Sequence, residues 1–592
     1  MSVAKLQAFF RAHPVAGPIP CLVLALLALS AQPALARFAS ADCPDWKPQE
    51  FRYVKVVTRD NDSTLAEPLK LALDTRTDGK TDIYFVERHG KVKRWNAADN
   101  TVTQLAFLDT WTDSPDKIDS TGDTEAGLEA IALDPRFHEN HWLYLRYEPW
   151  LKEVYRIARF EVKGDSLDMK SEKVILEIPF VREHTHKQAI VLGGSGMVFD
   201  GEGNLLIAVG ANSELSPSVN ERYRDFSAEY TASNLASLRG AILRIHPDDS
   251  PRGYSIPKGN FAEYFSAKFR SAGNAPVADA YADTAKVKPE IYVKGVRNPY
   301  SLAVDPTRNL VAWGEFGPNR MGLTRIEEDN LVSHPSYGGY PYWSGKNEYL
   351  LGDMEPWAAA KLDPKAPMNA SVWNQGPKEL PPSDTPLYAY SAYLNNGFIV
   401  GNHPTVGPIY HYDSQSPSPV KLPPHFDKAW FVTDRVGGVR IFELDATGAY
   451  LTDSAMLVTE QKMERPLDLQ QGGDGALYVV DYGPGWHLPS LQTNIGRIEY
   501  TGVCRPGVQS ALHRSQAGPR LRIRFLSSTV EIEEPGPHTV RLLDLEGREL
   551  RTWRGIGPQA YALGKAEQGG VRLITVTLPG VGRSVSAITA AP

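Results

Sequence analysis

A short pattern of alternating aromatic and aliphatic residues recurs along this chain. Each copy follows a turn rich in Gly, Asp or Asn, and most copies end in an acidic residue. Period-two alternation bounded by turn residues predicts β-strands. Six copies over about 450 residues give roughly 75 residues per unit, which leaves room for roughly four strands and long loops in each unit. The copies are residues 81–87, 141–148, 204–210, 309–315, 428–434 and 476–481.

Repetition of one small sheet with no open edge is the arrangement of a β-propeller. The sequence therefore predicts an all-β chain whose main domain, residues 43–504, is a six-bladed β-propeller. The irregular spacing excludes simple WD or kelch repeats, and a large β-sandwich assembly is the alternative. Residues 213–285 and 345–391 interrupt the pattern; the first is polar and loop-rich, with one strand expected at 240–245. Long loops of this kind often carry binding surfaces.

The pattern changes again after Cys504. Residues 520–590 contain short alternating runs separated by turns, which predicts a separate small β-sandwich over residues 507–592. Its layout resembles the immunoglobulin-like C-terminal modules of exported bacterial proteins, including secretion-sorting domains. A role in sorting or attachment is the corresponding hypothesis.

The first 36 residues have the features of a signal peptide. Lys5 and Arg11 give a positive start, residues 21–29 are apolar, and Ala34-Leu35-Ala36 fits a cleavage site. An uncleaved N-terminal anchor is the alternative. No later stretch reaches the roughly 18 apolar residues of a membrane-spanning helix. We therefore expect export to the periplasm, the cell surface or the medium, without a membrane span.

Two cysteines, Cys43 and Cys504, remain after cleavage. They bracket the predicted propeller, and an oxidising compartment favours a disulfide between them. Two unpaired buried thiols are the alternative.

Composition limits the remaining function classes. The chain has 592 residues, of which 42% are hydrophobic, and a formal charge of −7. This is enough apolar material for a large core. The absence of any tract rich in Lys and Arg argues against nucleic acid as a partner. The sequence has no Gly-x-Ser-x-Gly elbow, His-Glu-x-x-His helix or Gly-rich phosphate loop, so those enzyme classes have no support.

Seven segments, in order, resemble the soluble glucose/sorbosone dehydrogenase family across about residues 50–500. The resemblance implies a six-bladed propeller that binds pyrroloquinoline quinone (PQQ) and a calcium ion over its central channel. It also implies oxidation of an aldose-type sugar, or a related alcohol or aldehyde, by hydride transfer to the quinone. A sugar and an electron acceptor would be the partners. The segments are residues 127–137, 193–210, 238–247, 290–306, 315–318, 337–341 and 464–483.

Sugar oxidation needs a base for the hydroxyl proton and a hydride acceptor, and no side chain accepts a hydride. A tricarboxylate quinone needs fixed cations, which Arg supplies as planar donors, and calcium needs oxygen ligands. The resemblance assigns these roles as follows: Arg297 to the cofactor and the reacting centre, Asn298, Arg435 and Arg465 to the cofactor, and the carbonyls of Gly317 and Pro318 to calcium. The alternatives are an Arg297 that pairs with a neighbouring blade, surface arginines and an ordinary turn.

The chain departs from the family at the catalytic base. The family has a His directly before the Gly-Gly of residues 193–194 and an Asp that orients it; this chain has Leu192 and Ala211 there. His184 and His186 stand a few residues upstream, and one of them would serve as base, with Glu183 or Asn212 as its orienting group. Two exposed loop histidines are the alternative. The same fold with a decayed pocket would instead bind a glycan or a protein at the cell surface.

Two clusters leave their roles open. Glu327, Glu328 and Asp329 form a charge run that would either bind a second cation or lie exposed. The aromatic residues Tyr337, Tyr340, Tyr342 and Trp343 would either stack on a sugar ring or fill a blade core.

Overall fold

The computed structural model divides the chain into two compact units, Met1–Pro506 and Gly507–Pro592. In the first unit it describes residues 50–110, 126–181, 193–212, 224–225, 227–317, 326–349, 363–391, 403–434, 438–444, 451–457, 463–484 and 490–501. In the second unit it describes seven strands.

The described part of the first unit contains six successive antiparallel sheets, the blades of a propeller. Blade 1 is β2 (Pro68–Thr75), β3 (Thr81–Glu87), β4 (Lys91–Asn96) and β5 (Thr101–Phe107). Blade 2 is β6 (Leu128–Leu133), β7 (Trp142–Tyr147), β8 (Val154–Lys163) and β9 (Ser166–Pro179). Blade 3 is β10 (Met197–Phe199), β11 (Leu205–Val209), β12 (Ala241–Pro247) and β14 (Ile291–Lys294), extended by the two-residue strands β13 (Tyr254–Ser255) and β18 (Ser336–Tyr337).

The remaining blades repeat the same order of strands. Blade 4 is β15 (Pro299–Asp305), β16 (Leu310–Glu315), β17 (Ile326–Val332) and β21 (Tyr388–Ser391). Blade 5 is β22 (Thr405–Ile409), β23 (Ala429–Thr433), β24 (Val439–Leu444) and β25 (Leu451–Leu457). Blade 6 is β26 (Pro466–Gln471), β27 (Leu477–Asp481), β28 (Asn494–Tyr500) and β1 (Phe51–Val57).

The six copies of the sequence pattern are the second strands of the six blades. These strands, β3, β7, β11, β16, β23 and β27, lie inside the sheets and are almost completely buried along their length. Burial on both faces accounts for their apolar composition. The six-bladed propeller that the sequence predicts is confirmed.

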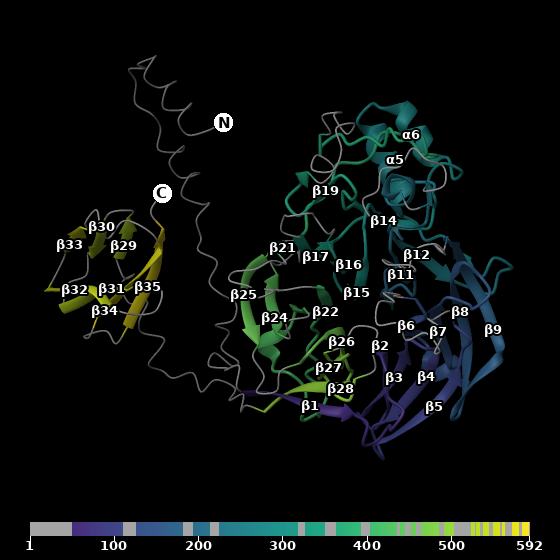
Figure 1. Ribbon diagram of the computed structural model, residues 1–592, viewed down its shortest axis with the longest axis horizontal. Coiled ribbons are helices and arrows are strands. Elements are labelled where there is room, and N and C mark those ends of the chain that lie inside the picture. The colour runs from purple at the N-terminus through teal and green to yellow at the C-terminus, as the bar shows by residue number, and fades with distance from the viewer. Residues whose placement is uncertain are drawn as a thin grey trace. The chain divides into compact units, whose positions relative to one another are not determined.

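The ring closes through strands from opposite ends of the propeller sequence. Blade 6 takes three strands from the end of the propeller sequence and β1 from its beginning, with Phe51 opposite Tyr500 (Figure 1). First strands of successive blades are in contact all the way round, and β2 contacts β26. A second link joins blades 1 and 6, because the hydroxyl of Tyr482 donates a hydrogen bond to buried Glu67. Closure joins blade 6 to blade 1 and completes the ring.

The buried carboxyl of Glu67 predicts that the propeller becomes less stable at low pH. Burial raises the pKa of this carboxyl, but hydrogen bonds from His89 and Tyr482 and the charge of Arg88 outweigh it and lower the pKa to about 2. A lowered pKa stabilises the fold above the unfolded value near 4.5, and this contribution is lost as the pH falls from there toward 2. The contribution is on the order of 3 kcal/mol.

Glu67→Gln is therefore expected to lower the unfolding temperature at pH 7 and to reduce the drop in that temperature between pH 6 and pH 3. Thermal unfolding of the wild type and the variant across this range measures both effects. Asp413 is exposed, and Asp413→Asn is the matched control. Parallel pH curves for wild type and Glu67→Gln would contradict the prediction.

Antiparallel blades bring particular connections to one end of the propeller. The chain enters the first strand of a blade and leaves the second strand at the same end, which we name the top face. Its described segments are residues 58–67, 88–90, 108–110, 126–127, 148–153, 180–181, 193–196, 210–212, 224–225, 227–240, 295–298, 316–317, 403–404, 434, 438, 463–465, 482–484 and 490–493. Loops from all six blades therefore meet there, as the sequence signals for long loops imply.

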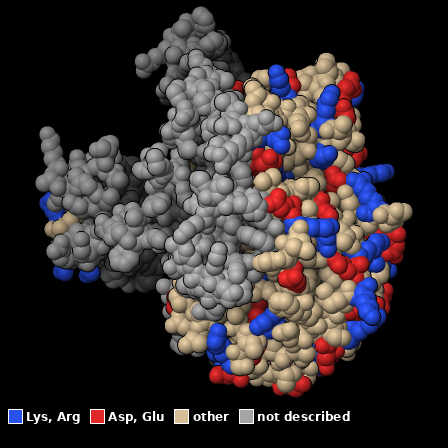
Figure 2. Space-filling view, turned by 45° about the vertical axis from the view of Figure 1, so that its right-hand side comes forward, with Lys and Arg blue, Asp and Glu red and all other residues tan. Residues whose placement is uncertain are grey.

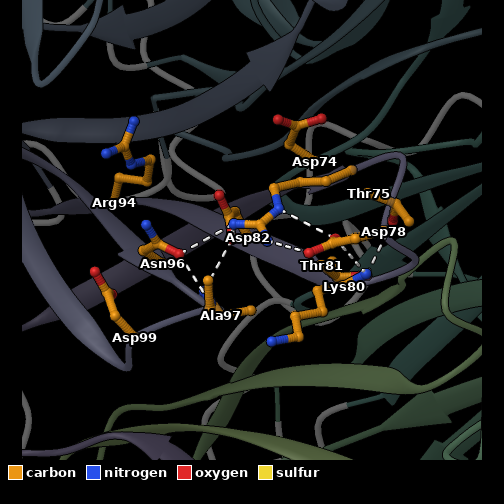
Figure 3. Close-up of polar contacts among 12 residues, drawn as sticks. Asp74, Thr75, Asp78, Lys80, Thr81, Asp82, Arg94, Asn96, Ala97 and Asp99 are labelled. Atoms are coloured by element: carbon orange, nitrogen blue, oxygen red, sulfur yellow. Dashed lines mark hydrogen bonds and ion pairs between the residues drawn. The ribbon is translucent and has the colours of Figure 1, made fainter.

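The opposite end carries tight turns as well as the longer connections 248–290 and 410–428. Figure 3 shows the turn between β2 and β3, where the amide of Lys80 donates to Asp78 at 3.1 Å and the hydroxyls of Thr75 and Thr81 are 2.9 Å apart. The amide of Ala97 donates to Asp82 at 2.8 Å and joins the next turn to the same sheet. In these turns, side-chain oxygens accept hydrogen bonds from backbone amides and stabilise the turn locally.

The segment expected to be a polar loop between residues 213 and 285 contains helical structure. α5 (Phe261–Ser271) and α6 (Ala275–Ala282) pack together beside blade 3 (Figure 1). Phe261, Phe265 and Tyr281 bury the apolar faces of the two helices. The expected strand at 240–245 is confirmed as the first part of β12. The all-β interpretation holds for the blades and misses this helical insertion.

Charges of both signs are interspersed over the visible face of the first unit (Figure 2). Exposed Asp249, for example, forms ion pairs with Arg159 at 3.1 Å and with Lys173 at 3.2 Å. Exposed pairs of this kind contribute little to stability. No helix among the described residues combines the length and the apolar character that crossing a membrane requires.

The second unit contains two antiparallel sheets. One has the order β29 (Ile523–Leu526), β30 (Thr529–Ile532), β33 (Gln559–Ala562). The other has the order β32 (Glu549–Ile556), β31 (Pro537–Leu543), β34 (Val571–Leu578), β35 (Arg583–Ala590).

Candidate functional site

The described site residues that the sequence singled out all lie on the top face. Arg297 and Asn298 form the connection into β15, Gly317 follows β16, and Arg465 directly precedes β26. Arg297, Asn298 and Arg465 are buried. Blades 4 and 6 thus each bring part of the predicted set to one end of the propeller. His184, His186, Arg435, Pro318, Glu183, Leu192, Cys43 and Cys504 lie outside the described residues.

The side chain of Arg297 binds the segment that directly follows β16, the second strand of its own blade. Its Nη1 donates to the carbonyl oxygens of Phe316 at 3.0 Å and Gly317 at 3.1 Å, and the guanidinium lies 5.5 Å from the Phe316 ring centre. A buried guanidinium requires such acceptors. Arg297 and Gly317 are therefore in direct contact across the first two strands of blade 4.

Glu315 fixes the backbone of the same pair. Its Oε1 accepts hydrogen bonds from the amides of Arg297 at 2.6 Å and Asn298 at 2.7 Å. Burial raises the pKa of Glu315 to about 8, and the nearby Glu328 carboxylate adds to this, while the two amides act in the opposite direction. In the sequence Glu315 is only the acidic end of a strand, so its inward role is visible only in the fold.

Asn298 connects blade 4 to blade 3. Its Oδ1 accepts a hydrogen bond from the amide of Gly194 at 2.9 Å, and the carbonyl of Arg297 accepts one from the amide of Ala211 at 2.7 Å. Ala211 is fully buried, so no carboxylate occupies the position where the family's orienting Asp is expected. The Arg297-Asn298 pair is thus fixed directly beside the segment that departs from the family pattern.

Arg465 occupies the equivalent position in blade 6. Its amide donates to Oδ1 of Asp481 at 2.8 Å, and its Nη2 donates to the carbonyl of Pro484 at 3.1 Å. Asp481, which ends β27, thus holds the entry to β26 as Glu315 holds the entry to β15. In both blades, an acidic residue at the end of the second strand accepts hydrogen bonds from backbone amides of the arginine-containing segment that precedes the first strand.

The charge run at residues 327–329 is buried, which corrects the interpretation that it lies exposed. Glu327, Glu328 and Asp329 are all at most 6% exposed. Glu327 accepts the amide of Gly317 at 3.0 Å, and Glu328 accepts the hydroxyl of Ser344 at 2.8 Å. Burial raises the pKa of Asp329 to about 8. Glu327 therefore supports the Gly317 turn, a role that the sequence did not reveal.

The aromatic cluster is part of the blade packing. Its members Tyr337, Tyr340, Tyr342 and Trp343 are at most 4% exposed and belong to the core between blades 2 and 3. Tyr340 and Trp343 also line a small cavity behind Arg297, which Glu315, Gly317 and Glu328 share. The cavity has room for about one water molecule.

Several buried arginines lie on the top face. Among the described residues, buried guanidinium groups come from five blades: Arg88 after β3, Arg146 at the end of β7, Arg239 before β12, Arg297 before β15 and Arg465 before β26. Arginine is the side chain that matches carboxylate geometry. The carbonyl of Gly317 accepts one bond from Arg297 and has a second lone pair for a cation. No group of three or more His, Cys, Asp or Glu side chains placed to hold a metal occurs among the described residues.

Comparison with known proteins identifies the family. The family model described as Glucose / Sorbosone dehydrogenase matches residues 65–262 and 266–403. An uncharacterized protein of Synechocystis sp. is 26% identical over 60% of this chain and 68% of its own length. The aldose sugar dehydrogenase YliI of Escherichia coli K12 is 21% identical over 45% of this chain and 61% of its own length. The PQQ-bound aldose sugar dehydrogenase of Streptomyces coelicolor, 16% identical, covers 76% of this chain and 97% of its own, with a TM-score of 0.47. The chain belongs to the glucose/sorbosone dehydrogenase family.

Proposed function

We propose that this protein is an exported dehydrogenase that oxidises an aldose-type sugar, or a related alcohol or aldehyde, with PQQ and calcium as cofactors. Bound PQQ would accept the hydride from the sugar carbon. Arg297 would stabilise negative charge that develops on the substrate oxygen. Asn298, Arg435 and Arg465 would hold the quinone, and the carbonyls of Gly317 and Pro318 would bind calcium.

The buried Arg297-Asn298 pair is the observation that carries the proposal. Glu315 holds both backbone amides at 2.6 and 2.7 Å, and the guanidinium is anchored on the Phe316-Gly317 turn. A cation fixed in advance, and shielded from water, stabilises charge more strongly than a mobile surface arginine does. Family membership supplies the reaction type that this arrangement suits.

Reconstitution tests the proposal. Purified mature protein is mixed with PQQ and CaCl₂, and aldoses are then supplied with an artificial electron acceptor. We expect quinone absorbance on the protein and turnover that requires both PQQ and calcium. A protein that neither binds PQQ nor turns over any aldose would overturn the proposal.

The base is expected to be His186 or His184. Replacing the true base by Gln should lower kcat by about 10² to 10⁴-fold while PQQ still binds, whereas the other replacement should have little effect. Steady-state rates and quinone titration of His184→Gln and His186→Gln measure this difference. Full activity in both variants would show that neither histidine is the base.

The alternative is a propeller without catalysis that binds a glycan or protein. Buried Ala211, which stands where the family's Asp is expected, favours it. In that case saccharide or partner binding would occur without PQQ and would survive Arg297→Ala.

A further inference from the structure

Arg146 is the most completely buried guanidinium on the top face, with an exposure of 0%. It stands at the end of β7 in blade 2, and its ion pair with Glu129 spans 3.0 Å. The guanidinium lies 4.4 Å from the centre of the Tyr155 ring. Complete burial of an arginine is costly unless several partners are fixed around it. The remaining partners of Arg146 indicate what it does there.

Those partners belong to blade 3. Nη2 of Arg146 donates to the carbonyl of Gly193 at 2.8 Å, and Nη1 donates to the carbonyl of Gly194. The amide of Gly194 in turn donates to Oδ1 of Asn298 at 2.9 Å. The carbonyl of Gly193 and the amide of Gly194 belong to one peptide group, which is planar and stiff. A single rigid group is therefore held by Arg146 on one side and by Asn298 on the other.

The turn can be held this closely because it has no side chains. Gly194 has φ +67°, and a Cβ on it would lie 2.5 Å from the amide nitrogen of Gly210. A Cβ on Gly193 would lie 3.3 Å from the hydroxyl of Tyr155 and 3.5 Å from Nη2 of Arg146. The two glycines thus let the peptide plane approach the guanidinium directly.

We propose that Arg146 is a positioning residue that sets the orientation of the Asn298 side-chain amide through the Gly193–Gly194 peptide. Because the Oδ1 of Asn298 is committed to the amide of Gly194, its Nδ2 must face away from that peptide. Glu315 fixes the backbone of Asn298, and the blade 3 contact engages the oxygen of its side chain. This inference rests on the proposed function only in that Asn298 would contact the quinone.

Lysine is the informative replacement. Arg146→Lys keeps a cation beside Glu129 but cannot donate to both glycine carbonyls as a planar fork does. Arg146→Gln combined with Glu129→Gln avoids an unpaired buried carboxylate and serves if the lysine variant fails to fold. Arg244→Lys is the matched control, because Arg244 is also a buried arginine of the propeller but binds Asp200 and Glu202 at the turn between β10 and β11, at the opposite end.

The first measurement needs no cofactor. Hydrogen exchange of the peptide that contains Gly194 is followed by mass spectrometry in the full-length protein. We expect Arg146→Lys and Asn298→Ala each to speed exchange of the Gly194 amide at least tenfold, and Arg244→Lys to leave it unchanged. A wild-type exchange rate in Arg146→Lys would overturn the proposal.

The second measurement couples the two residues. PQQ is titrated in the presence of CaCl₂ into wild type, Arg146→Lys, Asn298→Ala and the double variant. We expect each single change to weaken binding and the double variant to be weakened by clearly less than the product of the two factors. Factors that simply multiply would overturn the link. If wild type binds no PQQ, the proposed function fails, and the exchange rates alone decide the role of Arg146.

Discussion

Replacing Arg297 by methionine is expected to lower kcat/KM for PQQ-dependent sugar oxidation by about 10³-fold. The variant keeps a similar apolar stem but removes the cation that is anchored on the carbonyls of Phe316 and Gly317. Most of the loss should appear in kcat, because a charge that develops in the transition state is stabilised there more than in the bound substrate. Steady-state kinetics on the reconstituted protein measures this split.

A matched arginine of the same blade controls for general loss of charge. Arg308 pairs with Asp305 at 2.5 Å in the turn between β15 and β16, at the end opposite the top face. Arg308→Met should therefore retain turnover while losing a similar guanidinium. Activity of Arg297→Met within tenfold of wild type, in a protein with an unchanged unfolding temperature, would remove Arg297 from the reaction.

Gly127→Ala is expected to destabilise the propeller by about 3 to 5 kcal/mol, the combined cost of backbone strain and overpacking. Gly127 has φ +138°, and a Cβ on it would lie 2.2 Å from the carbonyl oxygen of Arg88. That carbonyl accepts the amide of Leu128, so the clash falls on the hydrogen bond that joins blades 1 and 2. Neither backbone can move without opening this contact between blades.

Gly164→Ala separates the effect of conformation from that of crowding. Gly164 has φ +61° in the turn between β8 and β9, but a Cβ there would meet nothing within 4 Å. Its replacement should cost only about 1 kcal/mol. Chemical or thermal unfolding of the two variants gives the comparison, and equal losses of stability would refute the role of close packing at Gly127.

The repeated strands are the part of the fold that the sequence predicted most closely. Residues 81–87 are β3 without any shift in its ends, and the five other copies lie within one residue of theirs. Strands enclosed on both faces have apolar patterns strong enough to read locally. The helices α5 and α6 were missed, although Phe261 and Phe265 have helical spacing and the side chain of Asn274 caps α6. Their short length and mostly polar surroundings hid this signal.

The sequence by itself therefore determined the propeller and the number of its blades, because these follow from local strand patterns and family motifs. Only the tertiary structure decided that β1 completes blade 6 beside β28, since this pairing joins residues at opposite ends of the propeller sequence. It also decided that Glu315, Glu327 and Arg146 point inward to hold Arg297, Gly317 and the Gly193–Gly194 turn. A charged residue at a strand end has the same local pattern whether it faces solvent or a buried amide. Its role is set by partners from other strands and blades, which local sequence does not specify.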